Sequence, residues 1–204
     1  MKSVPYPVVE PVIELGILAL QLSKPEKELA LKIRKRAVER GYMDSPDGWF
    51  VPLVDLLNDL DVVAEFLWHE ARHFGEFEIG GGFVIKISPQ EQLGIPFDST
   101  FRFAFDLANV VLSLGRSEHK NVAVGAQEFW NISADSVLEY IYIQGGSKGP
   151  AVRVAIEPLQ KQLRAAKSLV VKFATALEDR LKLYEDWRIA SGEFKYMFGL
   201  DKIG

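Results

Sequence analysis

The sequence contains no cysteine, and this absence excludes two kinds of site. Without thiols the chain can form neither disulfide bonds nor thiolate metal sites. Histidine is nearly as scarce, with three residues in a chain of 204. These three matter below, because two of them fall within a single motif.

Long apolar runs are also missing. The apolar patch of residues 1–22 is interrupted by Pro5, Pro7, Glu10, Pro11 and Glu14, which argues against a signal peptide. The longest apolar runs fall far short of the roughly 20 residues that a membrane-spanning helix needs. We therefore expect a cytoplasmic protein with no membrane partner.

Positive charge is not in excess, since the formal net charge is −4. Residues 1–95 contain 10 Lys and Arg against 15 Asp and Glu, a balance of −5, whereas residues 151–204 contain 10 against 7, a balance of +3. A general polyanion binder is basic throughout, so this class is excluded. A length of 204 residues with 48% hydrophobic residues indicates a globular protein of one or two domains.

The N-terminal part of the chain predicts short helices followed by a hairpin. Pro11 can open a first helix, and Ser23–Glu26 has the form of a capping box that opens a second, ending at Gly41. Further along, the pattern predicts a strand over 48–51 and helices over 52–60 and 61–74. The glycines of 80–82 predict a turn that pairs residues 77–79 antiparallel with residues 83–87.

The C-terminal part predicts mainly helices. Residues 99–115 are apolar on nearly all sides, which indicates a buried central helix. Residues 123–143 predict a helix with a polar stripe of Glu128, Asn131, Asp135 and Glu139, and residues 151–157 fit a strand or a helix equally well. From Pro158 onward apolar residues recur in steps of four and three, at Leu159, Leu163, Ala166, Val170, Phe173 and Leu177, and less strictly at Leu181 and Tyr184. This spacing predicts a long amphipathic helix over 158–190 that packs within the chain or forms a homodimer through the 159–184 stripe.

Two segments carry a resemblance to a known fold: DGWFVPLVDLLNDL and the following VVAEFLWHEARHFGEFEIGGGFVIKIS. Over residues 24–88 they resemble the winged-helix module of La-motif RNA-binding proteins and the N-terminal lobe of the RNA 2'-phosphotransferases. The resemblance covers about a third of the chain, and nothing after Pro89 resembles the phosphotransferase catalytic lobe. It implies a winged-helix-like lobe over 1–95, followed by a helical region over 96–204. An α+β lobe without winged-helix geometry is the alternative.

Basic residues that could contact nucleic acid lie on the second predicted helix. Lys32, Lys35, Arg36 and Arg40 fall near one face of it, as phosphate binding requires. Ordinary surface ion pairs are the other interpretation, for example Glu28 with Lys32 one turn later.

The motif HEARH places His69 and His73 four residues apart with Glu70 between them. On a helix, two histidines at this spacing can share a zinc ion, and the glutamate can act as the general base of a metallopeptidase. A third ligand is needed, and Glu128 is the first candidate, with His119 as the other. Alternatively, both histidines end an ordinary helix whose C-terminal dipole favours cationic imidazoles.

These patterns together predict a mostly α protein with a small β-hairpin, a winged-helix-like N-terminal lobe and a helical bundle ending in a long amphipathic helix. The function we expect is a non-enzymatic binding module, associated with nucleic acid or serving as a protein–protein adaptor, with no cofactor. The alternative is a small zinc metallopeptidase that uses His69, Glu70 and His73.

Overall fold

The structure is a computed structural model. It describes residues 6–16, 28, 31–32, 35, 38–39, 44–45, 48–74, 80–94, 100–145, 150–184 and 187–200. For residues 15–16, 44–45, 48–49, 69–74 and 188–190 the description covers the backbone only.

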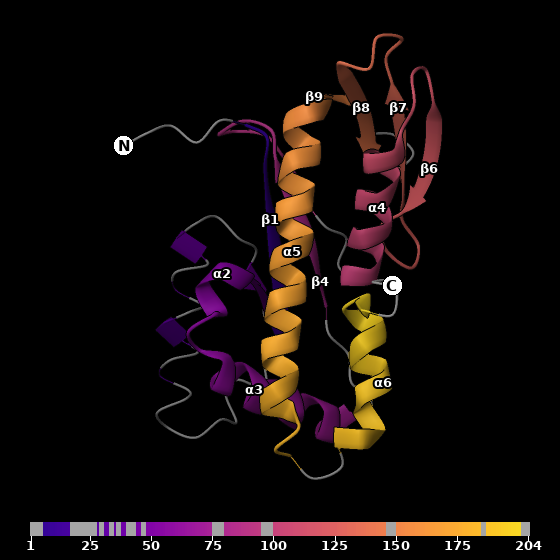
Figure 1. Cartoon of the computed structure of the whole chain (residues 1–204). Helices are drawn as coiled ribbons and strands as arrows, with labels where there is room; N and C mark the ends of the chain where they lie inside the picture. The colour runs from indigo at the N-terminus through magenta and orange to yellow at the C-terminus, as the bar shows by residue number, and fades with distance from the viewer. Residues whose placement is uncertain are drawn as a thin grey trace. The chain divides into compact units, whose positions relative to one another are not determined.

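The described residues form an α/β protein, so the expectation of a mostly α fold is wrong. Their strands build one five-stranded and one four-stranded sheet. The labelled helices are α2 (Leu53–Leu56), α3 (Leu60–Phe74), α4 (Phe101–Ser113), α5 (Ile156–Leu181) and α6 (Trp187–Met197), as Figure 1 shows.

The five-stranded sheet has the order β2-β3-β1-β4-β5. Its strands are β1 (Val8–Gly16), β2 (Asp44–Ser45), β3 (Gly48–Pro52), β4 (Gly81–Lys86) and β5 (Gln92–Leu93). The helix expected from Pro11 is wrong, because this segment is β1 and pairs antiparallel with β3, with Val12 opposite Pro52. Val9, Val12 and Ile13 are buried, and β-branched side chains favour a pleated, buried surface over a helix.

β4 is an inner strand of this sheet and not one arm of a two-stranded wing. Its neighbours are β1 and β5, with Ile85 opposite Leu93. Gly81 and Gly82, expected in the turn, belong to the strand itself. The two-stranded wing of the predicted winged-helix-like lobe is therefore wrong, because β4 lies between β1 and β5. The other predicted arm of the hairpin, residues 77–79, lies outside the described residues.

The four-stranded sheet has the order β6-β7-β8-β9, and all of its pairs are antiparallel. Its strands are β6 (His119–Ala123), β7 (Phe129–Ala134), β8 (Tyr140–Gly145) and β9 (Val152–Ala155). The helix expected over 123–143 is wrong, because this stretch forms the β7–β8 hairpin. Asp135 closes the turn, since its two carboxylate oxygens accept hydrogen bonds from the backbone N–H groups of Glu139 (2.9 Å) and Tyr140 (3.2 Å).

The long helices were predicted more accurately. α4 lies within the predicted range 99–115 and buries Phe101, Phe105 and Val111, which confirms a buried helix here. α5 begins at Ile156, so residues 152–155 form strand β9 and the ambiguous segment is divided between strand and helix. Pro158 lies in the first turn of α5, where a missing backbone N–H leaves no hydrogen bond unmade.

The apolar stripe of α5 is buried within the chain. Leu159, Leu163, Val170, Phe173, Leu177 and Leu181 have no exposed surface, and Ala166 has almost none. The helix ends at Leu181, short of the predicted residue 190, and α6 follows from Trp187. No helix among the described residues is long and apolar enough to span a membrane.

The chain divides into two compact units that are interleaved in sequence. One contains residues 1–11 and 82–168, and the other contains residues 12–81 and 169–204. The sequence had suggested a boundary between residues 95 and 96. In the second unit the aromatic core includes a stacked pair, Trp68 and Tyr184, with ring centroids 5.4 Å apart, and a closer pair, Phe194 and Phe198, at 4.6 Å.

Candidate binding surface on the β6–β9 sheet

The two faces of the four-stranded sheet differ in burial because side chains alternate along each strand. Trp130, Ile132 and Ala134 of β7 are buried, as are Ile141 and Ile143 of β8. Figure 1 shows α4 lying along this sheet, and α4 contacts β6 through the buried side. The other side, which we call the outer face, consists of His119, Asn121, Ala123, Phe129, Asn131, Ser133, Tyr140, Tyr142, Gln144, Arg153 and Ala155.

Aromatic rings stand out on this outer face. Phe129 is 52% exposed and Tyr142 is 38% exposed, which is unusual for side chains whose burial is favourable. A third ring, that of Tyr140, carries the guanidinium of Arg153 at 3.6 Å from its centroid. This cation–π contact holds an exposed positive charge in one orientation beside Tyr142, its neighbour across the strands.

Polar side chains fill the positions between the rings. The register places Asn121 opposite Asn131 and Asn131 opposite Gln144, so three amides form a row across three strands. The next row runs from His119 through Ser133 and Tyr142 to Arg153. Side-chain amides carry both donors and acceptors, so this row can form paired hydrogen bonds with a planar polar group.

No carboxylate occupies a strand position of the outer face. Two nearby acids, Glu118 and Glu128, bond to the protein itself, whereas Glu139, the residue before β8, is exposed. Glu118 pairs with Lys120 at 2.8 Å and accepts the Gly115 N–H at 2.6 Å, and these two hydrogen bonds, Lys120 first, lower the pKa of Glu118. Glu128 accepts the indole N–H of Trp130 at 2.9 Å.

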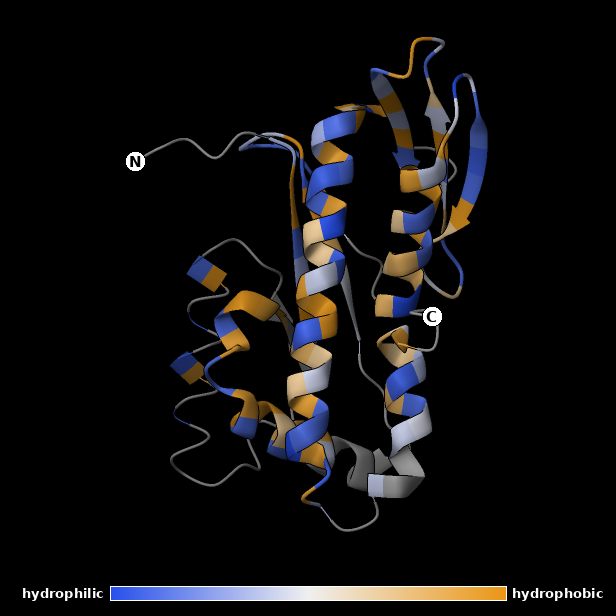
Figure 2. Cartoon of the chain, viewed as in Figure 1, coloured by the Kyte–Doolittle hydropathy of each residue, from blue (hydrophilic) through white to orange (hydrophobic). Residues whose placement is uncertain are grey.

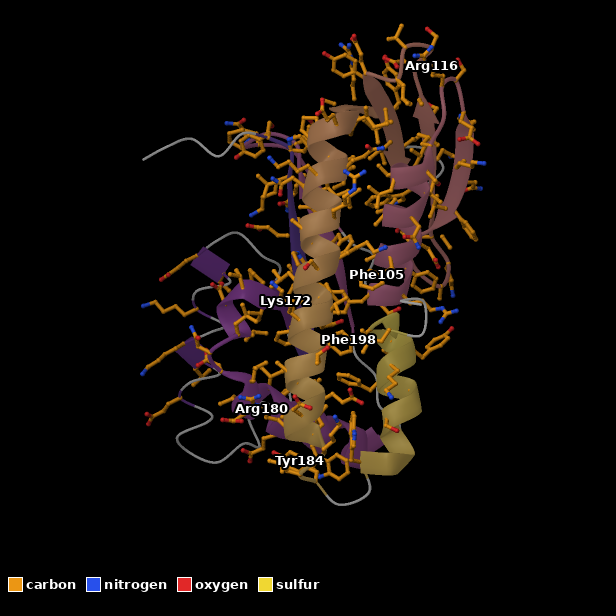
Figure 3. The ribbon with its side chains drawn as sticks, viewed as in Figure 1. Phe105, Arg116, Lys172, Arg180, Tyr184 and Phe198 are labelled. Atoms are coloured by element: carbon orange, nitrogen blue, oxygen red, sulfur yellow. The ribbon has the colours of Figure 1, made fainter. Side chains whose placement is uncertain are left out.

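The edge of the sheet is hydrophilic. β6 is an edge strand, and Figure 2 shows most of it as hydrophilic. Arg116, in the turn before β6, is exposed and lies at the loop end of the sheet, as labelled in Figure 3. The outer face and its rim therefore present rings, amides and positive charge together.

The predicted zinc ligands are divided between the two compact units. His69, Glu70 and His73 lie on α3, whose backbone is helical throughout, but their side chains lie outside the described residues. The predicted helical stripe that was to supply Glu128 does not exist, because Glu128 precedes strand β7 and bonds to Trp130. His119 lies on the outer face of β6. Among side chains that the structure describes, no cluster of three metal-binding residues occurs.

The predicted nucleic-acid-binding residues are described in part. Lys32 and Lys35 are helical and exposed, and Lys35 lies 3.9 Å from Glu39 in a surface ion pair. Arg36 and Arg40 lie outside the described residues. An exposed pair of this kind contributes little to stability, so Lys35 remains accessible to a ligand.

The outer face was missed in the sequence, although a signal for it is present. In Phe129–Ala134 and Tyr140–Gly145 apolar residues recur at every second position (Trp130, Ile132 and Ala134, then Ile141 and Ile143), and both segments contain aromatic and β-branched residues, which is typical of strands. No protein-family model, curated protein or solved structure matches this chain. The likeness to La-motif modules therefore stays a prediction.

Proposed function

We propose that this chain is a non-enzymatic, cytoplasmic binding module that associates with nucleic acid through the outer face of the β6–β9 sheet. The observation that carries the proposal is the pairing of exposed rings with the oriented guanidinium of Arg153 on a face without carboxylates. Aromatic rings stack on bases, at about 1–3 kcal/mol for each base. Guanidinium groups bind phosphate oxygens with two N–H donors at once.

Charge on this face is more favourable for phosphate than the net charge of −4 suggests. The charged side chain at a strand position of the outer face is Arg153, and the imidazole of His119 lies in the same row. Arg116 adds positive charge at the rim. The exposed Lys32 and Lys35 of the earlier helical segment are a second set of candidate phosphate contacts.

The test is fluorescence anisotropy with labelled oligonucleotides of mixed sequence, first at low salt and then over a salt titration. We expect binding that weakens with added salt, because phosphate contacts release counterions. Arg153→Glu should weaken it by roughly tenfold or more, since a charge-assisted hydrogen bond is replaced by repulsion.

Arg164→Glu is the matched control, because it changes the net charge by the same amount. Arg164 is exposed on α5, which packs against α4 through a hydrogen bond from Gln160 to the Val111 carbonyl, and it does not belong to the outer face. Equal losses for the two variants would contradict a specific site. A complete lack of binding at low salt would reject nucleic acid and favour the protein–protein adaptor.

A zinc metallopeptidase remains the second candidate. The continuous helix of α3 through residue 74 supports it, because residues 69 and 73 then lie one helical turn apart on the same side of the helix. In that case His69 and His73 would bind zinc and Glu70 would activate the attacking water. Measurement of bound metal tests this alternative.

A further inference from the structure

We infer that the outer face of the β6–β9 sheet takes unpaired bases of a single-stranded nucleic acid, with one base on Phe129 and another on Tyr142. The inference rests on the proposed function, since it names the form of nucleic acid that the same face accepts. Its physical basis is the difference between what a duplex and a single strand expose. A duplex presents phosphates and base edges, whereas its base faces are stacked against one another and closed to a protein ring.

The exposed rings cannot stack on the bases of a duplex, because those base faces are already stacked on one another. Phe129 is the more exposed of the two, and a phenyl group offers no hydrogen bond to a phosphate or to a base edge. Its binding chemistry is limited to apolar burial and stacking, and every unpaired base has a face that can stack. Ring exposure on this face therefore selects for bases that are already unstacked.

The spacing of the rings sets how many nucleotides the face spans. Phe129 and Ser133 are four residues apart on β7, or about 14 Å at roughly 3.4 Å for each residue, and Tyr142 lies directly opposite Ser133. Adjacent stacked bases are separated by only about 3.4 Å. This separation is several times the rise between stacked bases, so the span between the two rings has room for an intervening nucleotide.

That intervening nucleotide lies over the amide row. Asn131 occupies the position between Phe129 and Ser133, and Asn121 is its partner on β6. A side-chain amide can donate to and accept from a base edge at the same time, as asparagine does with adenine. The face therefore combines two ring positions that tolerate any base with a middle position that discriminates among bases.

Arg153 supplies the phosphate contact for the nucleotide on Tyr142. Its guanidinium is held over Tyr140, and it lies opposite Tyr142 in the strand register. Because the cation–π contact orients the group before binding, less side-chain entropy is lost when a phosphate binds. A neutral sugar polymer could also stack on the rings, but it has no phosphate for the Arg153 guanidinium to bind.

The experiment compares one labelled single strand of mixed sequence with the duplex formed by adding its complement. Binding is measured by fluorescence anisotropy on the full chain at low salt and at physiological salt. We expect the single strand to bind at least tenfold more tightly than the duplex. Phe129→Leu and Tyr142→Leu should each reduce single-strand affinity by roughly five- to 150-fold, the change expected from one lost stacked base.

Two further variants separate stacking from damage to the fold. Phe129→Trp keeps a stacking ring and should lose much less affinity than Phe129→Leu. Tyr196→Leu removes a ring that is 51% exposed on α6, outside the sheet, and should have no effect. Asn131→Leu should reduce the difference in affinity among homopolymer strands of the four bases more than it reduces the mean affinity.

The outcomes distinguish this inference from the proposed function. Equal affinity for duplex and single strand, or full affinity in both leucine variants, overturns single-strand recognition, whereas a selective loss in Arg153→Glu keeps nucleic-acid binding. Failure of both nucleic acids to bind overturns both proposals. Salt-independent binding of a neutral oligosaccharide, lost in Phe129→Leu, assigns the face to a different ligand.

Discussion

Glu118 is a carboxylate whose ionised form is stabilised by two neighbours. The Lys120 ammonium group and the Gly115 backbone N–H both donate to it, and together they lower its pKa below the ordinary value of 4.5. A carboxyl with a lowered folded-state pKa stabilises the fold above its unfolded pKa, and this contribution disappears as the pH falls through the folded value. We expect Glu118→Gln to lose the contribution at neutral pH and to show a smaller fall in stability between pH 5 and acid. Urea unfolding as a function of pH measures this, and identical profiles for the two proteins would contradict it.

Gly80 is a position where a side chain has no room. A methyl group there would lie 2.9 Å from the Glu14 Cβ atom, while the Glu14 N–H donates to the Gly80 carbonyl at 2.9 Å and holds the two backbones together. We expect Gly80→Ala to lower the free energy of unfolding by about 1–3 kcal/mol, as overpacking does. Gly94→Ala is the control, because a methyl group there meets no atom within 4 Å. Urea denaturation should show little change for this control or a small gain, and equal losses would argue against a clash at Gly80.

Helices and strands differ in how well the sequence predicts them. The sequence correctly predicts α3, α4 and α5 because each repeats its apolar residues over three or more turns, which a strand cannot accommodate. The stretch that forms the β7–β8 hairpin predicts a helix instead, because Glu128, Asn131, Asp135 and Glu139 fall near helical spacing. Cross-strand pairing decides between the two periods, and it depends on residues distant in sequence. The amide row and the Arg153–Tyr140 contact could not be predicted for the same reason, since both require the strand register.

α5 allows one substitution to be compared at a buried and an exposed site. Leu177 has no exposed surface, whereas Leu183, two residues beyond the end of the helix, is 84% exposed. We expect Leu177→Ala to cost about 2–5 kcal/mol through lost burial and a residual cavity. Leu183→Ala should stay within about 0.5 kcal/mol of the unaltered protein. Chemical denaturation monitored by tryptophan fluorescence measures both, and similar costs would show that the end of α5 is not packed as described.

We do not expect the chain to dimerise through the apolar stripe of α5. Because its apolar residues are buried within the chain, the prediction of a homodimer through residues 159–184 loses its structural basis. We expect light scattering to give the mass of one chain, 22.9 kDa, at micromolar concentration. A dimer that persists after Leu183→Ala and dissociates after Phe129→Leu would instead indicate self-association through the outer face.

A zinc site on α3 needs a third ligand from elsewhere in the chain. Glu128 was the first candidate for that ligand, but it precedes a strand and accepts the Trp130 indole N–H at 2.9 Å. A zinc ion would have to compete with the Trp130 indole N–H for the Glu128 carboxylate. We therefore expect elemental analysis of protein purified without chelator to find much less than one zinc per chain. Close to one zinc, lost in His69→Ala or His73→Ala and retained in Glu70→Gln with loss of peptide hydrolysis, would establish the metallopeptidase instead. Glu128→Gln then identifies the third ligand: it should release the metal if Glu128 binds it, and leave the metal in place if another side chain does.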